Sequence, residues 1–279
     1  MEIWGHTLFK NEEKWLWYAV SSVIDHVDKL LLWDTGSTDA SYKIAESLAK
    51  QYPAKIVLKR YGEVTIKTFP DVRQIMLEET EADWLLVCDA DEIWFKESVA
   101  DVVKEINFRG NVIESIVVPT INLVGDIYHR LPESAGRYQF GKKRGHYNLR
   151  AVKTSIPGLH SQGQHGVWGW ADADNRMIQG RGAGRVAFVD APYLHTTFLP
   201  RGGTRVADAI VPKIFRKLKY EIGKELPADF YYPEVFFLPR PDIVPSPWQV
   251  MGSSYKVRAS YETPLKKIKR KIIHGKIGY

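Results

Sequence analysis

Apolar residues follow two different spacings along the first 120 residues of the chain. Short runs that are apolar at almost every position are typical of strands buried on both faces. We expect such strands at residues 3–9, 29–33, 55–58, 84–88 and 112–118. Between them, apolar residues recur every three or four positions, which predicts helices with one apolar stripe each, at 13–24, 42–49, 72–80 and 99–106. Strands that alternate with helices predict an α/β fold with a mostly parallel central sheet flanked by helices.

The pattern loosens after about residue 120. Gly, Arg, His and Trp become dense, and a polar stretch runs from residue 158 to 184. We expect a last strand at 186–189 and a basic amphipathic helix at 206–226. Residues 227–264 hold seven prolines and many aromatic residues, which favours extended chain packed over the domain. The predicted organisation is one domain at 1–200, with halves at 1–120 and 121–200, and a C-terminal helical and extended appendage at 201–279.

The composition is that of a globular protein, with 279 residues of which 44% are apolar and 26% charged. No window approaches the ~18 consecutive apolar residues that a membrane-spanning helix needs, and the start lacks the order of a signal peptide. We therefore expect a cytoplasmic protein. The single cysteine, Cys88, excludes a disulfide framework and a Cys-rich zinc site, so any bound metal would have oxygen and imidazole ligands.

The net charge of +6 is concentrated at the C-terminus. Residues 263–279 contain no acid and six bases, and without these six the chain has 33 bases and 33 acids. The segment 265–273 mixes basic and aliphatic residues and could lie on the inner, anionic membrane face, where each base contributes about 1 kcal/mol. A solvated tail is the alternative. We expect no nucleic-acid partner, because the neutral body has no basic cluster and no reading motif.

Two acidic clusters follow strands at the edge where ligands bind to a parallel sheet. Asp89 and Asp91 flank one small residue directly after the strand at 84–88, so in extended chain both side chains lie on one side. Two carboxylates this close repel each other unless a cation or a shared proton lies between them. Mg²⁺ is commonly held by one or two carboxylates plus substrate phosphates, and Mn²⁺ accepts the same ligands. The alternative role of this pair is to cap the following helix.

Asp34 begins the second acidic cluster, in the polar loop at 34–39. The Ser37 or Thr38 hydroxyl is expected to cap the next helix. Such a cap leaves Asp34 available to a ligand.

Four segments together resemble the family-two glycosyltransferases of the GT-A fold. In chain order they are Lys10-Asn11-Glu12-Glu13, Trp33-Asp34-Thr35-Gly36-Ser37-Thr38-Asp39, Arg73, and Trp84-Leu85-Leu86-Val87-Cys88-Asp89-Ala90-Asp91-Glu92. The resemblance covers about residues 1–200 and is specific in the first hundred. It implies a nucleotide-sugar-binding half at 1–120 and an acceptor half at 121–200.

The resemblance also implies roles for single residues. Asp34 would contact the base and ribose of a nucleotide-sugar donor, Arg73 the diphosphate, and Asp89 and Asp91 the ribose and a Mn²⁺ or Mg²⁺ ion. Through this ion Asp91 would act on the reaction itself, since a cation stabilises the charge that grows on the departing nucleoside diphosphate. Glu12 would either contact the donor or cap a helix.

The residues that complete the site lie in the second half of the chain. His195, in Tyr193-Leu194-His195-Thr196-Thr197, resembles the third metal ligand of GT-A enzymes, with a structural hydrogen bond as the alternative. An inverting enzyme also needs a general base. Related sequences often carry an Arg in a strand and then a His-Glu pair. Here Asn148-Leu149-Arg150 is followed by Gly163-Gln164-His165-Gly166, with glycine in place of the acid. The candidate bases are therefore His165, Asp172 and Asp174.

The predicted function is transfer of a sugar from a nucleotide-diphosphate sugar to an acceptor hydroxyl. We expect metal dependence, inversion, and a place in glycan or cell-envelope assembly, with a glycan, a lipid-linked molecule or a protein as acceptor. One alternative is a noncatalytic nucleotide-sugar-binding module that docks a membrane or partner through its basic tail. Another is a nucleotidyltransferase, which should have a Gly-rich loop near the N-terminus, where residues 3–14 contain only Gly5.

Overall fold

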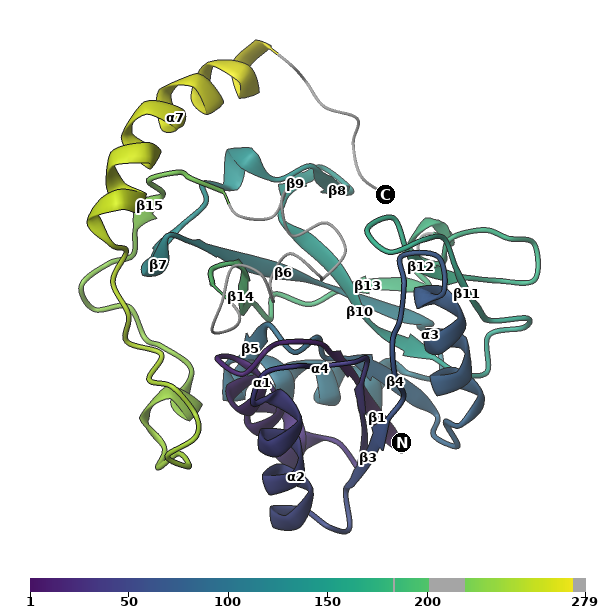
Figure 1. The fold of residues 1–279 in the computed structure, drawn as a ribbon. Coiled ribbons are helices and arrows are strands. Elements are labelled where there is room, and N and C mark those ends of the chain that lie inside the picture. Colours follow the sequence, from purple (N-terminus) through teal and green to yellow (C-terminus); the bar gives the residue numbers. More distant parts are fainter. Residues whose placement is uncertain (183, 201–218, 273–279) are drawn as a thin grey trace.

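The computed structural model describes residues 1–182, 184–200 and 219–272, which form a large mixed sheet with helices on both faces (Figure 1). Four parallel strands form one half of the sheet, in the spatial order β3-β2-β1-β4. They are β1 (Ile3–Phe9), β2 (Lys29–Asp34), β3 (Ile56–Arg60) and β4 (Trp84–Val87). These strands confirm the expectation for the first part of the chain.

The other half of the sheet is built around one long strand, β6 (Ser115–Val124). β10 (Tyr147–Lys153) lies antiparallel between β4 and β6, so β4 and β6 run in the same direction and end at the same edge. β13 (Val186–Phe188) and β14 (Tyr193–Phe198) both pair parallel with β6, and β5 (Glu92–Trp94) pairs antiparallel with β14. β7 (Asp126–Arg130) pairs antiparallel with β6, and β15 (Lys224–Glu225) pairs antiparallel with β7.

Helices cover both faces of the parallel half. The core on one face contains side chains of α1 (Leu16–Val23), α2 (Ser41–Gln51) and α4 (Lys96–Arg109). On the other face α3 (Phe69–Glu78) packs Val72 and Met76 against Trp4 and Trp33. Four short 3-10 helices are η1 (Ile24–His26), η2 (Glu133–Ala135), η3 (Ile178–Gly180) and η4 (Glu234–Phe237). Two small antiparallel hairpins join β8 (Tyr138–Phe140) to β9 (Lys143–Gly145) and β11 (His160–Gln162) to β12 (Gly169–Ala171).

The appendage differs from its sequence-based expectation. Residues 206–218 of the expected helix lie outside the described residues, and residues 219–226 are not helical but irregular apart from β15. The chain from 227 to 252 is irregular, as expected, but residues 253–264 belong to a helix, α7 (Ser253–Ile272). None of the helices in the described ranges is long and apolar enough to cross a membrane.

Candidate active site

Asp34 ends β2 at the carboxyl edge of the parallel strands and is 2% exposed. Its Oδ1 accepts a hydrogen bond from the backbone N–H of Ser37 (3.0 Å), and its Oδ2 lies 4.0 Å from Arg60 Nε. The turn from Asp34 to Ser37 passes through Gly36, whose φ of 94° is a left-handed conformation that suits glycine. The loop after β2 therefore fixes the direction of this carboxylate.

The loop after β1 is tied to the loop after β2. Asn11 donates its backbone N–H to Ser37 Oγ (3.0 Å), and its side-chain Oδ1 accepts the N–H of Thr38 (2.8 Å). Glu12, which is 3% exposed, donates its N–H to Ser41 Oγ (2.7 Å). The prediction that Ser37 or Thr38 caps α2 is wrong, because both hydroxyls bind Asn11 in the neighbouring loop. The N–H of Ser41 at the start of the helix is instead accepted by Asp39 Oδ1 (2.9 Å).

Asp89 follows β4 and is held by two arginines from different elements. Arg73 of α3 approaches Asp89 Oδ1 to 2.6 Å, and Arg150 of β10 approaches Oδ2 to 3.5 Å. Arg150 also pairs with Glu92, which accepts a hydrogen bond from the Tyr193 hydroxyl (2.8 Å). Neither Asp89 nor Asp91 caps the following helix α4. The two arginines and two carboxylates form one network at the carboxyl edge of β4.

The two carboxylates of this network differ in exposure and in protonation. Burial opposes ionisation of Asp89, but Arg73 and Arg150 outweigh it and hold the pKa of the Asp89 carboxyl below its usual value. Burial raises the pKa of the 0% exposed Glu92 to about 7, against the attraction of Arg150. The Asp89 side chain remains 31% exposed. Asp89 is thus an accessible anion, whereas Glu92 supports it from inside the protein.

Asp91 and His195 face each other at the start of β5. Antiparallel pairing of β5 with β14 sets His195 opposite Glu92, and Thr196 donates its N–H to the Asp91 carbonyl (2.8 Å). As a result, His195 Nε2 lies 3.5 Å from Asp91 Oδ1. The sequence placed the last strand at 186–189 and His195 after it. His195 instead lies within a further strand, β14, which spans residues 193–198.

The donor set fits a hard divalent cation only in part. Asp91 offers oxygen and His195 offers imidazole nitrogen, whereas the Asp89 carboxylate is engaged by Arg73 and Arg150. No group of three or more His, Cys, Asp and Glu side chains within the described residues is arranged to hold a metal. Two protein ligands are nevertheless compatible with Mg²⁺ or Mn²⁺, because diphosphate oxygens and water commonly supply the others.

Arg73 lies beneath the site surface rather than on it. Its side chain is 2% exposed, and its guanidinium lies 4.9 Å from the centre of the Trp168 ring and 5.4 Å from that of Phe69. The His165 ring packs on Phe69 at 4.7 Å, and the His165 N–H donates to the Ile66 carbonyl (3.2 Å). The loop that carries His165 and Trp168 therefore covers Arg73.

Asp172 does not join the other candidate residues. It pairs with Arg181, which also pairs with Glu114 (2.6 Å), and Glu114 directly precedes β6. This is the amino edge of the parallel strands, opposite to Asp89. Hydrogen bonds from the N–H groups of Arg176 and Asp174 lower the pKa of Asp172, with Arg181 adding to the effect. Asp172 therefore stabilises a turn, with exposed Asp174 at its tip, and lies apart from Asp89 and Asp91.

Comparison with known protein families decides between the fold's many possible functions. The sequence profile of glycosyl transferase family 2 matches residues 7–163. The chain belongs to this family. The matched range contains Asp34, Arg73, Asp89 and Asp91.

Solved structures of the GT-A fold are similar to this family-2 chain at low identity. S. aureus TarS 1–349 is 15% identical with a TM-score of 0.48, over 78% of this chain and 71% of that one. The mannosyltransferase PcManGT from Pyrobaculum calidifontis, solved with GDP-Man and Mn²⁺, is 15% identical with a TM-score of 0.44, over 75% and 59%. Glucosyl-3-phosphoglycerate synthase from Mycobacterium tuberculosis, solved with Mg²⁺ and UDP, is 17% identical with a TM-score of 0.44, over 78% of both chains. No curated protein matches the sequence.

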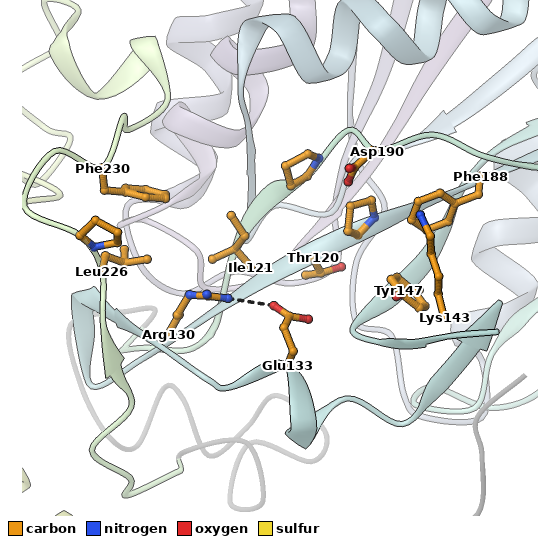
Figure 2. Close-up of a pocket in the computed structure, with 13 residues that line it drawn as sticks. Thr120, Ile121, Arg130, Glu133, Lys143, Tyr147, Phe188, Asp190, Leu226 and Phe230 are labelled. Carbon is orange, nitrogen blue, oxygen red and sulfur yellow. Dashed lines mark hydrogen bonds and ion pairs between the residues drawn. The ribbon is translucent and has the colours of Figure 1, made fainter. Parts of the chain in front are cut away.

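A cavity of about 490 Å³ lies between residues 119–192 and residues 226–230 (Figure 2). Its walls carry aromatic rings and charged groups together, and Figure 2 shows the ion pair of Arg130 with Glu133 on one side and Lys143 beside Phe188 on the other. The lining residues are Pro119, Thr120, Ile121, Arg130, Glu133, Lys143, Tyr147, Phe188, Asp190, Pro192, Leu226, Pro227 and Phe230.

Side-chain contacts connect this cavity to the charged network. Thr120 Oγ1 lies 3.3 Å from the Asn148 side-chain amide, which lies 2.6 Å from the Tyr193 hydroxyl. Tyr193 in turn binds Glu92, the partner of Arg150. A chain of side-chain contacts thus links the cavity wall to Arg150 and Asp89.

The sequence-based prediction gave no role to Glu92 or Tyr193, and it named Arg150 only as the arginine that precedes His165 in the pattern of related sequences. Arg150 carries a signal, because it is a charged residue within the apolar run Leu149-Arg150-Ala151-Val152. A charge at such a position needs a buried partner. The sequence does not show that this partner is Glu92, which comes from a strand 58 positions away in the chain.

Proposed function

We propose that this chain is a metal-dependent glycosyltransferase that transfers a sugar from a nucleotide-diphosphate sugar to an acceptor hydroxyl. The observation that carries the proposal is the set of carboxylates at one edge of the parallel sheet. Asp34 ends β2, Asp89 and Asp91 follow β4, and β1 lies between the two strands. Membership of glycosyl transferase family 2 supports the reaction class. Action in the cytoplasm, inversion at the sugar carbon and a place in glycan or cell-envelope assembly complete the proposal.

The donor nucleotide would lie along this edge, with Asp34 accepting hydrogen bonds from the base and ribose. Glu12 would lie near the base and ribose, because hydrogen bonds from Asn11 and Glu12 join its loop to the segment that follows Asp34. Asp89 would accept a ribose hydroxyl, because it is anionic and partly exposed. Arg73 is too deeply buried to reach a diphosphate on the surface, and we infer that it acts by orienting Asp89.

Asp91 and His195 would hold the Mn²⁺ or Mg²⁺ ion, with the diphosphate completing its ligands. When bound, such an ion neutralises the charge that develops on the departing nucleoside diphosphate. Glu92 and Arg150 keep the neighbouring Asp89 in one orientation and exclude water from beneath it. A site that needs little rearrangement during the reaction stabilises developing charge most effectively.

The acceptor would occupy the cavity in Figure 2. Aromatic rings such as Phe188, Tyr147 and Phe230 pack well on sugar rings, and the surrounding polar groups suit hydroxyls, so the lining supports a glycan as acceptor. Asp190 supplies a carboxylate that forms no ion pair with any described residue, whereas Glu133 is paired with Arg130. Asp190 therefore joins His165 as a candidate for the base that accepts the acceptor's proton.

Donor hydrolysis tests the proposal without knowledge of the acceptor. The protein would be incubated with UDP-, GDP-, CDP- and dTDP-sugars and Mn²⁺, and release of the nucleoside diphosphate would be measured. We expect release from one donor class and a loss on the order of 100-fold in Asp91→Asn. Asp101→Asn, an exposed position on α4, is the matched control and should keep full activity.

Two outcomes would count against the proposal. Equal release by Asp91→Asn and by wild type would remove Asp91 from the site. Binding of a nucleotide sugar without any release or transfer, in the presence of candidate glycans, would instead support the noncatalytic module.

A further inference from the structure

Helix α7 has an apolar face that points away from the protein. Ala259 and Thr263 are buried, at 0% and 7% exposed, and face the domain. The opposite side carries four large apolar side chains that are between 55% and 75% exposed, namely Val257, Tyr261, Leu265 and Ile268. Their spacing of four, four and three residues aligns them in one stripe along the helix.

This orientation of α7 is fixed by contacts on its inner face. Arg270 binds both carboxylate oxygens of Glu221 at 2.6 Å, and Glu221 is 1% exposed. Lys266 donates to the Tyr220 carbonyl (2.8 Å). Just before the helix, the Met251 N–H donates to an Asp126 carboxylate oxygen (3.0 Å). These bonds keep the apolar stripe from turning inward, and Figure 1 shows α7 as an arc along the outer rim of the molecule.

Basic residues flank the stripe on both sides. At about 100° per residue, Arg258 and Lys269 border the stripe on one side. On the other side Lys256 and Lys267 lie further round the helix, more than about 110° from the centre of the stripe, and both are exposed. Within residues 253–272 the only acid is Glu262, which is already paired with Arg258 (2.7 Å) and Lys266 (2.9 Å). The helix therefore has a central apolar stripe between two rows of positive charge.

We propose that the outer face of α7 binds the surface of an anionic lipid bilayer. The four apolar side chains would enter the boundary between headgroups and acyl chains, and the flanking bases would reach the lipid phosphates. A second copy of the chain fits less well, because two such faces would bring like charges together. A nucleic acid would need basic side chains at the centre of the face, whereas the centre of this face is apolar.

The position of α7 suits an enzyme that works beside a membrane. Asp126, which holds Met251, begins β7 directly after the turn that ends β6. Because β6 and β4 end at the same edge of the sheet, α7 lies at the end of the molecule that carries Asp89. The lipid contact depends on α7 alone and does not require that the proposed transferase activity be correct.

Vesicle flotation with the full chain tests the proposal. We expect wild type to float with vesicles of phosphatidylcholine that contain about a third phosphatidylglycerol, and to bind pure phosphatidylcholine at least tenfold less. Leu265→Ser and Tyr261→Ser should each reduce binding to the anionic vesicles about tenfold, because each removes an exposed apolar side chain. Phe108→Ser is the matched control, since Phe108 is 83% exposed on α4 and should not contribute.

Each alternative has its own signature. Binding that survives Leu265→Ser and Tyr261→Ser but disappears in salt would mean attraction of the basic residues alone and would overturn the proposal. A dimer that these substitutions dissolve, without any flotation of wild type, would assign the stripe to a second copy and would also overturn it. Circular dichroism of each variant confirms that the substitutions leave the fold intact, as expected for exposed positions.

Discussion

Replacing Arg150 by methionine should lower the free energy of unfolding by about 3–5 kcal/mol at pH 8. Arg150 is 10% exposed and pairs with Glu92, which is completely buried, and with Asp89. Methionine fills a similar volume but removes the charge. Glu92 would then remain in the interior with the Tyr193 hydroxyl as a hydrogen-bond donor and with Asp89 close by as a second negative charge.

The loss should depend on pH in a defined direction. Burial already raises the pKa of Glu92 to about 7 in the wild type, and removal of the guanidinium raises it further. A carboxyl with a raised pKa in the folded state disfavours folding at high pH, and this effect disappears as the pH falls toward the ordinary value of about 4.5. The difference between wild type and Arg150→Met should therefore be largest at pH 8 and clearly smaller at pH 5.5.

Urea unfolding at these two pH values measures both effects. Glu92→Gln in the Arg150→Met background should recover most of the stability lost at pH 8, since it removes the buried charge. Arg109→Met is the control, because Arg109 forms an exposed pair with Glu105 that is worth less than about 1 kcal/mol. The reasoning fails if Arg150→Met costs no more than this control at pH 8, or if the second substitution adds to the loss.

Three further predictions concern other parts of the site. Burial, with a smaller effect of Arg73, lowers the pKa of His6 to about 3, so the stability that neutral His6 contributes is fully present above about pH 6.5 and is lost as the pH falls. His6→Asn should therefore make the dependence of the unfolding free energy on pH shallower between pH 6 and 4, by up to about 1.4 kcal/mol per pH unit. An unchanged slope would contradict this. Phe188→Ala should raise the KM for a glycan acceptor several-fold while the rate of donor hydrolysis stays constant. A change in donor hydrolysis with an unchanged KM for the acceptor would mean that the acceptor does not bind in the cavity. Gly36→Ala should cost about 1 kcal/mol in thermal unfolding, because Gly36 has φ 94° and a Cβ there would lie 2.8 Å from Glu63 Oε1; an unchanged midpoint would refute it.

Much of the parallel half of the fold could be predicted from the sequence, because its strands and helices have clear and locally consistent apolar patterns. The run at 84–88 is apolar at every position, and β4 is indeed buried throughout. The strands β5 and β14 escaped prediction. β5 directly follows the acidic motif, and β14 contains His195 and two threonines, so neither has an apolar run. Their pairing with each other depends on contacts between distant segments.

The candidate site was predictable where residues follow strands, and not where it depends on partners. The ends of β2 and β4 bring Asp34, Asp89 and Asp91 to one edge, as parallel topology requires. The burial of Arg73 under Trp168 could not be predicted, because the covering loop comes from a hairpin almost a hundred residues later in the chain. The position of Asp172 at the opposite edge depends in the same way on Arg181 and Glu114.

Calorimetric titration of the protein with nucleoside diphosphates, with and without Mn²⁺, tests the central claim most directly. UDP, GDP, CDP and dTDP would each be titrated into wild type, Asp91→Asn and the control Asp101→Asn. The account predicts that one nucleotide binds wild type and the control with an affinity that Mn²⁺ increases, and that Asp91→Asn loses this increase. Absence of binding by every nucleotide, or the same metal dependence in Asp91→Asn, would contradict the assignment of this edge as a metal-dependent donor site.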